Sequence, residues 1–131
     1  MSKYNFTGSV LFCDDMRHEV GGKTSLIGVY SDTINVEQLP MEHPHFHTVA
    51  VITFDSFPEG LDEVEMTIQT PDGEEVSMQM QMPEDNRSIR TLRPVMIGRN
   101  LSVEAEGNFV VTVKVDGETR VIGEIPLVVE K

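Results

Sequence analysis

Three histidines, His43, His45 and His47, alternate along one short stretch and are the first candidates for chemistry. Imidazole is a common ligand of zinc, nickel and copper, and three histidines with an open fourth position would suit a catalytic zinc ion. In an extended strand all three would project to one side, but successive side chains there stand roughly 7 Å apart, too far to meet one ion. Pro44 also breaks regular pairing. We expect either a metal site using His45 and His47 with a distant carboxylate, or a solvated strand that happens to be rich in histidine.

A second candidate begins at the only cysteine, Cys13, which precedes Asp14 and Asp15. A reactive thiol needs an electropositive, partly exposed setting, and two adjacent carboxylates supply the opposite field. We therefore expect Cys13 to be a small buried apolar residue. The carboxylates are expected to bond nearby backbone or to pair with Arg17 or Lys23.

Four of the ten basic residues lie within thirteen positions of a chain that is otherwise acidic. They are Arg87, Arg90, Arg93 and Arg99. This local reversal of charge could bind an acidic patch on a partner or on a second copy of the chain. The alternative is internal pairing with nearby acids, for which the candidates are Glu84, Asp85, Glu104 and Glu106.

Short alternating segments must position these residues. Phe46–Phe54 alternates as a strand, and two further pairs of segments flank strong turn signals, Pro71-Asp72-Gly73 and Asp116-Gly117. Pro126 suits an edge strand, where a backbone N–H is not needed. No segment has sustained helical periodicity, so the sequence predicts an all-β fold, an antiparallel immunoglobulin-like β-sandwich of about seven to nine strands. We expect residues 1–131 to form a single domain of this kind.

The N-terminal part, Val10–Tyr30, predicts a central strand, a polar loop and a return strand. The loop is expected over Asp14–Lys23, with a helical turn at Asp15–Glu19 and a reversal at its double glycine. Gly28, within the return strand, indicates a bulge or a close neighbouring backbone.

Composition limits the possible partners. The 131 residues carry a formal net charge of −12, which disfavours binding to nucleic acids and to anionic membrane surfaces. One cysteine allows no internal disulfide, and there is no signal-peptide pattern and no apolar run long enough to span a bilayer. These features predict a cytoplasmic protein without a cofactor.

Two segments carry a family resemblance. The stretch CDDMRHEVGGKTSLIGVYSDTI resembles the N-terminal signature of a bacterial family of small uncharacterised β-sandwich proteins, and GNFVVTVKVDGETRVIGEIPLVVE is similar to that family's last hairpin. Together they cover about a third of the chain. The resemblance implies the sandwich fold and a bacterial or phage-derived origin, and it brings no activity with it.

These observations favour a non-enzymatic protein-interaction or structural module that binds a protein partner or self-associates. The expected contact residues are those of the Asp14–Lys23 loop and of the arginine segment. The alternative is a metal-binding protein, possibly hydrolytic, that uses His45 and His47. A third hypothesis is a small-ligand carrier that uses a methionine-lined space between the sheets.

Overall fold

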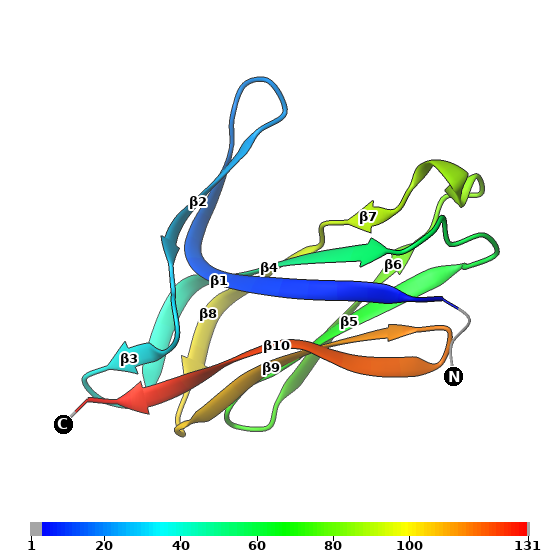
Figure 1. Cartoon of the computed structure of the whole chain (residues 1–131). Helices are drawn as coiled ribbons and strands as arrows, with labels where there is room; N and C mark the ends of the chain where they lie inside the picture. Colours follow the sequence, from blue (N-terminus) through cyan, green and yellow to red (C-terminus); the bar gives the residue numbers. More distant parts are fainter. Residues whose placement is uncertain (1–3, 131) are drawn as a thin grey trace.

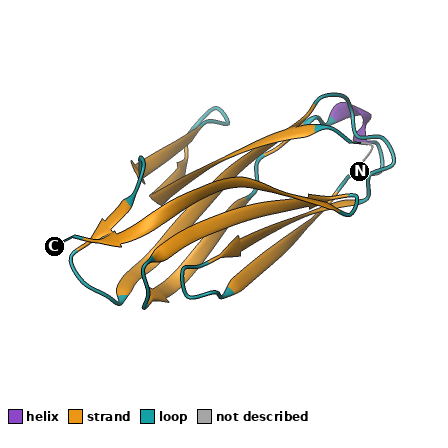
Figure 2. Ribbon diagram, turned by 60° about the horizontal axis from the view of Figure 1, so that its bottom comes forward, coloured by secondary structure: helices purple, strands orange, loops and turns teal. Residues whose placement is uncertain are grey.

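The computed structural model describes residues 4–130, apart from the side chain of Asn86, as two β-sheets packed face to face (Figures 1 and 2). The strands of the first sheet, sheet A, are β1 (Phe6–His18), β2 (Thr24–Val29), β4 (Met41–Phe54), β7 (Thr91–Leu92) and β8 (Val95–Val103). Their order is β2-β1-β4, and both β7 and β8 pair with the far side of β4.

Sheet B has the order β3-β10-β9-β5-β6. Its strands are β3 (Ile34–Val36), β5 (Glu63–Gln69), β6 (Glu75–Gln81), β9 (Gly107–Val115) and β10 (Glu118–Val129). A single turn of 3-10 helix, η1 (Asn86–Ser88), lies between β6 and β7.

The predicted antiparallel β-sandwich is confirmed. Every ladder is antiparallel except that of β3 with β10, which is parallel. The ten strands exceed the expected number because β3 and β7 contain only three and two residues, too short for an alternating pattern to be recognised.

The core lies between the sheets and follows from the alternation of apolar residues along the central strands. In β9, Phe109, Val111, Val113 and Val115 are all at most 1% exposed. Phe46 of β4 stacks on Phe109 with ring centroids 4.9 Å apart, which joins the two sheets. Full burial of each such side chain stabilises the fold by roughly 1.5–3 kcal/mol.

Arg120 ties the two sheets together at one side. Its Nη1 donates a hydrogen bond of 2.9 Å to the carbonyl oxygen of Phe6, and its guanidinium lies 4.4 Å from the centroid of the Phe6 ring. Its Nη2 donates to a carboxylate oxygen of Glu118 at 3.0 Å. A β10 side chain therefore fixes the start of β1 through both a polar contact and a cation–π contact.

The N-terminal strand is longer than expected. β1 continues to His18, and β2 begins at Thr24, so the predicted polar loop over Asp14–Lys23 is wrong for its first half. The predicted helical turn at Asp15–Glu19 is also wrong, because Asp15, Arg17 and His18 pair with β2. Only the residues around the double glycine form a turn.

Pro126 does not lie on an edge strand, as β10 is bonded on both sides. The physical reason that a proline is tolerated is the shortness of β3, whose ladder with β10 begins only at Leu127. The missing N–H of Pro126 thus falls just before the second ladder.

Candidate interaction site on the projecting hairpin

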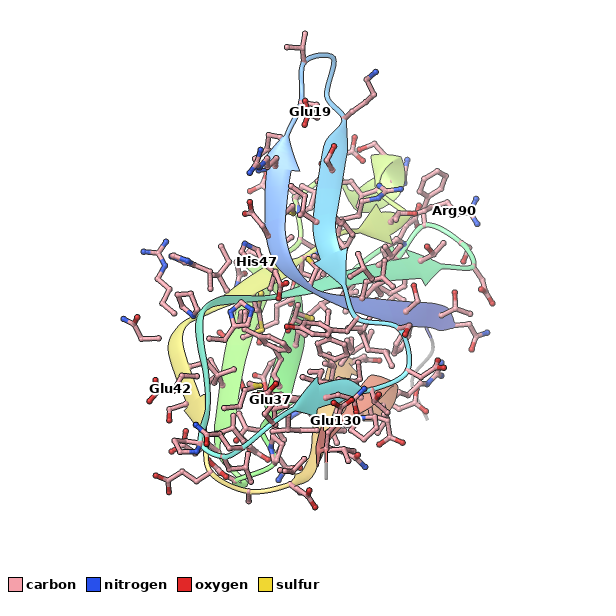
Figure 3. All side chains as sticks on the ribbon, turned by 90° about the vertical axis from the view of Figure 1, so that its left-hand side faces the viewer. Glu19, Glu37, Glu42, His47, Arg90 and Glu130 are labelled. Atoms are coloured by element: carbon pink, nitrogen blue, oxygen red, sulfur yellow. The ribbon has the colours of Figure 1, made fainter. Side chains whose placement is uncertain are left out.

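The hairpin of β1 and β2 extends beyond the rest of the sandwich (Figures 1 and 3). Its last pair is His18 with Thr24, and the N–H of Glu19 donates to the carbonyl oxygen of Lys23 at 2.7 Å to close the turn. Val20, at the tip, is 94% exposed. In Figure 3, Glu19 lies near this tip, and His47 of β4 lies near the base of the hairpin. The hairpin is therefore an arm with solvent on both of its faces.

The outer edge of this arm is β2, which among the strands of residues 4–130 pairs only with β1 and has no partner on its other side. Its sequence, TSLIGV, contains no charged residue. Ile27 and Val29 are exposed by 40% and 44%. Edge strands are normally protected by charge, proline or short length, so an uncharged edge of six residues is open to pairing with another chain.

Asp14 fixes the base of the arm. Its Oδ1 accepts a hydrogen bond of 2.6 Å from the hydroxyl of Tyr30 and one of 2.7 Å from Nε2 of His43 on β4. Gly28 lies across from it with φ +69°, a conformation that favours glycine. The register of β1 with β2 does not shift at Gly28, so the bulge that was one of the two expectations there is not present, and the close neighbour of Gly28 is the side chain of Asp14.

The ring of His43 has both nitrogens engaged. Its Nδ1 accepts a hydrogen bond of 3.1 Å from the backbone N–H of His45, so in the neutral ring the proton is on Nε2 and is donated to Asp14. The ring also packs edge-on against Phe46, with 5.7 Å between centroids. His43 is therefore committed to positioning Asp14.

The three histidines do not converge on one point. His45 is exposed and pairs across the ladder with Arg99, whereas His47 is only 6% exposed and lies between Cys13 and Ile97 in its row. Within the described residues, no group of three or more His, Cys, Asp or Glu side chains is placed to hold a metal ion. Metal binding by His45 with His47 stays a prediction.

Apolar side chains cover the outward face of sheet A beside the arm. One row across the sheet is formed by Leu11, Val49 and Val95, with Leu11 48% exposed. The next row begins at Val29 of the arm and ends at Ile97 of β8, which is 42% exposed. Between Val29 and Ile97, the members of this row are Cys13 and His47, which are buried, so the exposed apolar side chains of this face are separated from one another.

Cys13 lies in that second row and is fully buried, which confirms the expectation from the sequence. Burial raises the pKa of its thiol, and the carboxylates of Asp14 and Asp15 raise it further. A raised pKa leaves little thiolate at neutral pH, so the thiol is a poor nucleophile.

The remaining arm residues predicted as contacts lie close together. Asp15 Oδ2 accepts from Nε of Arg17 at 3.2 Å, and this contact lowers the pKa of the Asp15 carboxyl. Lys23 lies in the exposed turn. Asp14, in contrast, serves as an anchor.

The arginine segment is divided among different places. Nε of Arg87 pairs with Glu59 at 2.9 Å, and Arg90 donates to the carbonyl oxygens of Phe54 and Asp55. Arg93 and Arg99 are exposed and make no hydrogen bond or ion pair with other described residues. Arg99 pairs with His45, two residues along β4 from His47. In Figure 3, Arg90 lies well away from His47, so Arg90 and Arg99 do not belong to one patch.

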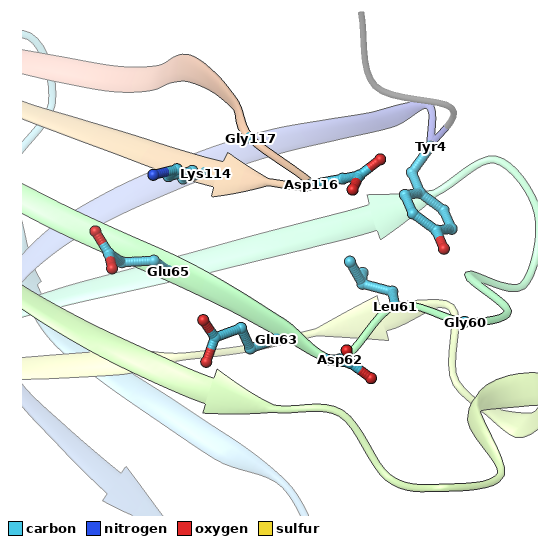
Figure 4. Close-up of a pocket in the computed structure, with 9 residues that line it drawn as sticks. All are labelled: Tyr4, Gly60, Leu61, Asp62, Glu63, Glu65, Lys114, Asp116 and Gly117. Atoms are coloured by element: carbon cyan, nitrogen blue, oxygen red, sulfur yellow. The ribbon is translucent and has the colours of Figure 1, made fainter.

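An acidic depression of about 500 Å³ lies at the far end of the sandwich (Figure 4). It is lined by four carboxylates, those of Asp62, Glu63, Glu65 and Asp116, together with Lys114, Tyr4, Leu61 and two glycines. These residues come from separate segments, and no sequence spacing brings them together. The depression accounts for part of the acidity of the chain.

Comparisons with known proteins bear on the fold and the family. No curated protein matches the chain. Among solved structures, a β-glucosidase from Listeria innocua in complex with isofagomine is similar over 97% of this chain but only 16% of its own, at 11% identity and a TM-score of 0.40. In residues 4–130, no helix is long and apolar enough to cross a membrane. Residues 8–130 match the model of a family of unknown function, DUF6941, and the chain therefore belongs to that family.

Proposed function

We propose that this protein is a non-enzymatic interaction module whose contact element is the β1–β2 arm. The observation that carries the proposal is the unpaired, uncharged edge of β2 on a hairpin that projects from the sandwich. A partner that offers an extended strand could pair with this edge through backbone hydrogen bonds, while Ile27 and Val29 bury apolar surface.

The other sheet edges support the choice of β2. β6 and β8 each carry a charged residue, Glu75 and Arg99, and β3 and β7 are at most three residues long. Charge and short length both discourage edge pairing. β2 is therefore the longest uncharged edge strand of the described residues.

The charge distribution also supports the arm as the contact element. Residues 14–29 contain three acids and two bases, a net charge of −1, whereas the whole chain carries −12. Like-charge repulsion opposes the approach of a second acidic chain to most of the surface but is weak at the arm. This favours contacts at the arm for acidic and neutral partners alike.

Two side chains of kinds that often serve in catalysis, Cys13 and His43, are poorly suited to it here, which supports a non-enzymatic role. The Cys13 thiol has a raised pKa, and both nitrogens of His43 are used to hold Asp14 and the strand. We also place the protein in the cytoplasm of a bacterium or in a phage-derived setting, as the resemblance of residues 13–34 and the single cysteine suggest.

The test combines a partner screen with edge-blocking variants. Light scattering over a dilution series first determines whether the partner is a second copy; affinity capture with cross-linking then maps contacts to β2. Ile27→Lys together with Val29→Lys should abolish the cross-links and weaken capture at least tenfold. Val121→Lys, a change of the same kind at a 60% exposed valine of β10, is the matched control and should have no effect. Equal capture by the double variant and the wild type would refute the proposal.

A further inference from the structure

The free edge of β2 presents a defined set of backbone groups. The N–H of Glu19 donates to the carbonyl oxygen of Lys23, so the Lys23 carbonyl faces β1. Backbone groups alternate in direction along an antiparallel strand, and the register of Thr24 to Ile27 with β1 is unbroken. The N–H and C=O groups of Thr24 and Leu26 therefore point away from β1. They offer a partner strand two donors and two acceptors.

A second copy of β2 can satisfy all of these groups in one register. If two β2 strands run antiparallel with Ser25 opposite Ser25, Thr24 of each copy lies opposite Leu26 of the other, and each such pair exchanges two hydrogen bonds. Centring the contact one residue earlier or later leaves only one regular pair. The next residue to pair would then be Gly22 or Gly28, whose φ of +75° and +69° depart from strand geometry. A two-fold symmetric contact therefore favours the Ser25 register.

The same register brings opposite charges of the two copies together. Ile27 of one copy lies opposite Lys23 of the other, and Asp15 is the ladder neighbour of Ile27 on β1. Lys23 is then two strand spacings, roughly 10 Å, from Asp15 of the second copy, and its long stem can lie along Ile27 to reach it. Asp15 already accepts a hydrogen bond from Arg17, but a carboxylate has further acceptor positions.

Antiparallel pairing also keeps most of the negative charge apart. Each arm projects from its own sandwich, so the two sandwiches lie at opposite ends of the paired strands (Figures 1 and 3). The Arg17 residues of the two copies end one row, three strand spacings or roughly 14 Å apart, which exceeds the Debye length of about 8 Å. Parallel pairing would instead place two chains of net charge −12 side by side.

We propose that the protein forms a two-fold symmetric dimer in which β2 pairs antiparallel with β2 of a second copy, centred on Ser25. The dimer rests on the proposed function, since it names the partner of the arm. It joins the two arms into one four-stranded sheet of order β1-β2-β2-β1. The paired strands are short, so we expect the dimer to dissociate at micromolar concentrations.

Single cysteine variants test the register. Ser25 would form a non-hydrogen-bonded pair with its copy, with Cα atoms about 4.5 Å apart, a separation that a disulfide can bridge. Ser25→Cys should therefore form a disulfide-linked dimer with diamide at least tenfold faster than Thr24→Cys or Ser77→Cys. Thr24 lies diagonally from its copy, roughly 8 Å away, and Ser77 is an exposed serine of the edge strand β6. The wild type, whose Cys13 is buried, gives the background rate.

Exchange of charges tests the same contact without a disulfide. Lys23→Glu and Asp15→Lys should each weaken the dimer at least threefold in sedimentation equilibrium. The double variant should return to within twofold of the wild type, because opposite charges then meet again between the copies. Arg93→Glu changes the net charge by as much as Lys23→Glu but lies between β7 and β8, away from the arm, and should weaken the dimer by less than twofold.

The outcomes separate this dimer from the proposed function. The dimer is excluded if Ser25→Cys cross-links no faster than Ser77→Cys or Thr24→Cys, or if the wild type sediments as a monomer at millimolar concentration. A monomeric wild type whose β2 still cross-links to a different captured protein would exclude the dimer alone and leave the arm as the contact element. A monomeric wild type whose captured partners map away from β2 would refute both.

Discussion

Asp14 connects three separate segments of the chain through one carboxylate. Burial alone would raise the pKa of this group, but hydrogen bonds from Tyr30 and His43 outweigh burial and lower it. Burial and the hydrogen bond to Asp14 raise the pKa of the Tyr30 hydroxyl. Asp14 is half exposed, so solvent screens part of this effect.

The lowered pKa of Asp14 predicts a specific pH dependence of stability. A carboxyl whose pKa is lower in the folded state stabilises the fold above its unfolded pKa of about 3.9, and this contribution is lost as the pH falls through the folded pKa. Wild type should therefore be more stable than Asp14→Asn at pH 6, and the difference should shrink between about pH 4 and pH 2. Urea unfolding at each pH measures it.

The control removes one donor to the same carboxylate. In a Tyr30→Phe background Asp14 keeps only the hydrogen bond from His43, so the pH dependence of the Asp14→Asn effect should become smaller. A stability difference that stays constant from pH 6 to pH 2 would contradict the assignment of Asp14 as the anchor.

At the scale of elements, Gly28 determines how the arm leaves the sandwich. Its φ is +69°, and a Cβ at this position would lie 2.5 Å from Oδ2 of Asp14. Both the backbone conformation and the close approach therefore require glycine. Gly73, in the β5–β6 turn, has a similar φ of +88° but open space around the position of a Cβ.

The contrast between Gly28 and Gly73 allows the cost of backbone strain to be separated from the cost of the steric clash with Asp14. Gly28→Ala should lower the free energy of unfolding by roughly 2–4 kcal/mol, since it adds a steric clash to the backbone strain. Gly73→Ala should lower it by roughly 1–2 kcal/mol from the strain alone. Denaturant unfolding measures both. In an Asp14→Ala background Gly28→Ala should cost less than in wild type, because the contacts of 2.5 and 3.0 Å to the carboxyl group are gone and only that of 3.1 Å to the Cβ remains. Equal losses for the two single variants would show that Asp14 does not constrain Gly28.

The hairpins differ in how far the sequence predicts them. β5–β6 and β9–β10 are confirmed, because one face of each hairpin packs against the core and their turns carry strong signals. Asp116 and Gly117 have φ of +50° and +81°, as their turn type requires. The arm could not be recognised in the same way. Solvent covers both of its faces, so no alternation of apolar residues marks the strand beyond Cys13.

At the scale of the molecule, pairing order limits what can be predicted. Periodicity identifies which residues face inward, and the burial of Phe46, Ala50 and Ile52 follows from it. Periodicity does not predict that β3 pairs with β10, or that β6 and β8 are edge strands of the two sheets. The acidic depression depends on that order, so it could not be inferred from spacing along the chain.

The uneven distribution of charge predicts a salt effect. Four carboxylates surround the depression in Figure 4, and like charges close together destabilise a fold at low ionic strength. Asp62→Asn with Asp116→Asn should raise Tm by roughly 2 °C at about 20 mM NaCl, with no gain at about 0.5 M. Asparagine also accommodates the positive φ of Asp116.

A control of equal charge decides whether position or net charge matters. Asp32→Asn with Glu37→Gln also removes two charges, but from the segments around β3, at the opposite end of the molecule from Asp116 (Figure 1). If repulsion is concentrated at the depression, this pair should change Tm by less than half as much. Scanning calorimetry at both salt concentrations measures Tm for the two double variants. Equal increases in Tm would instead attribute the effect to the net charge of −12. Repulsion localised at the depression would leave the weakly charged arm free to approach a partner, because the two lie at separate parts of the sandwich.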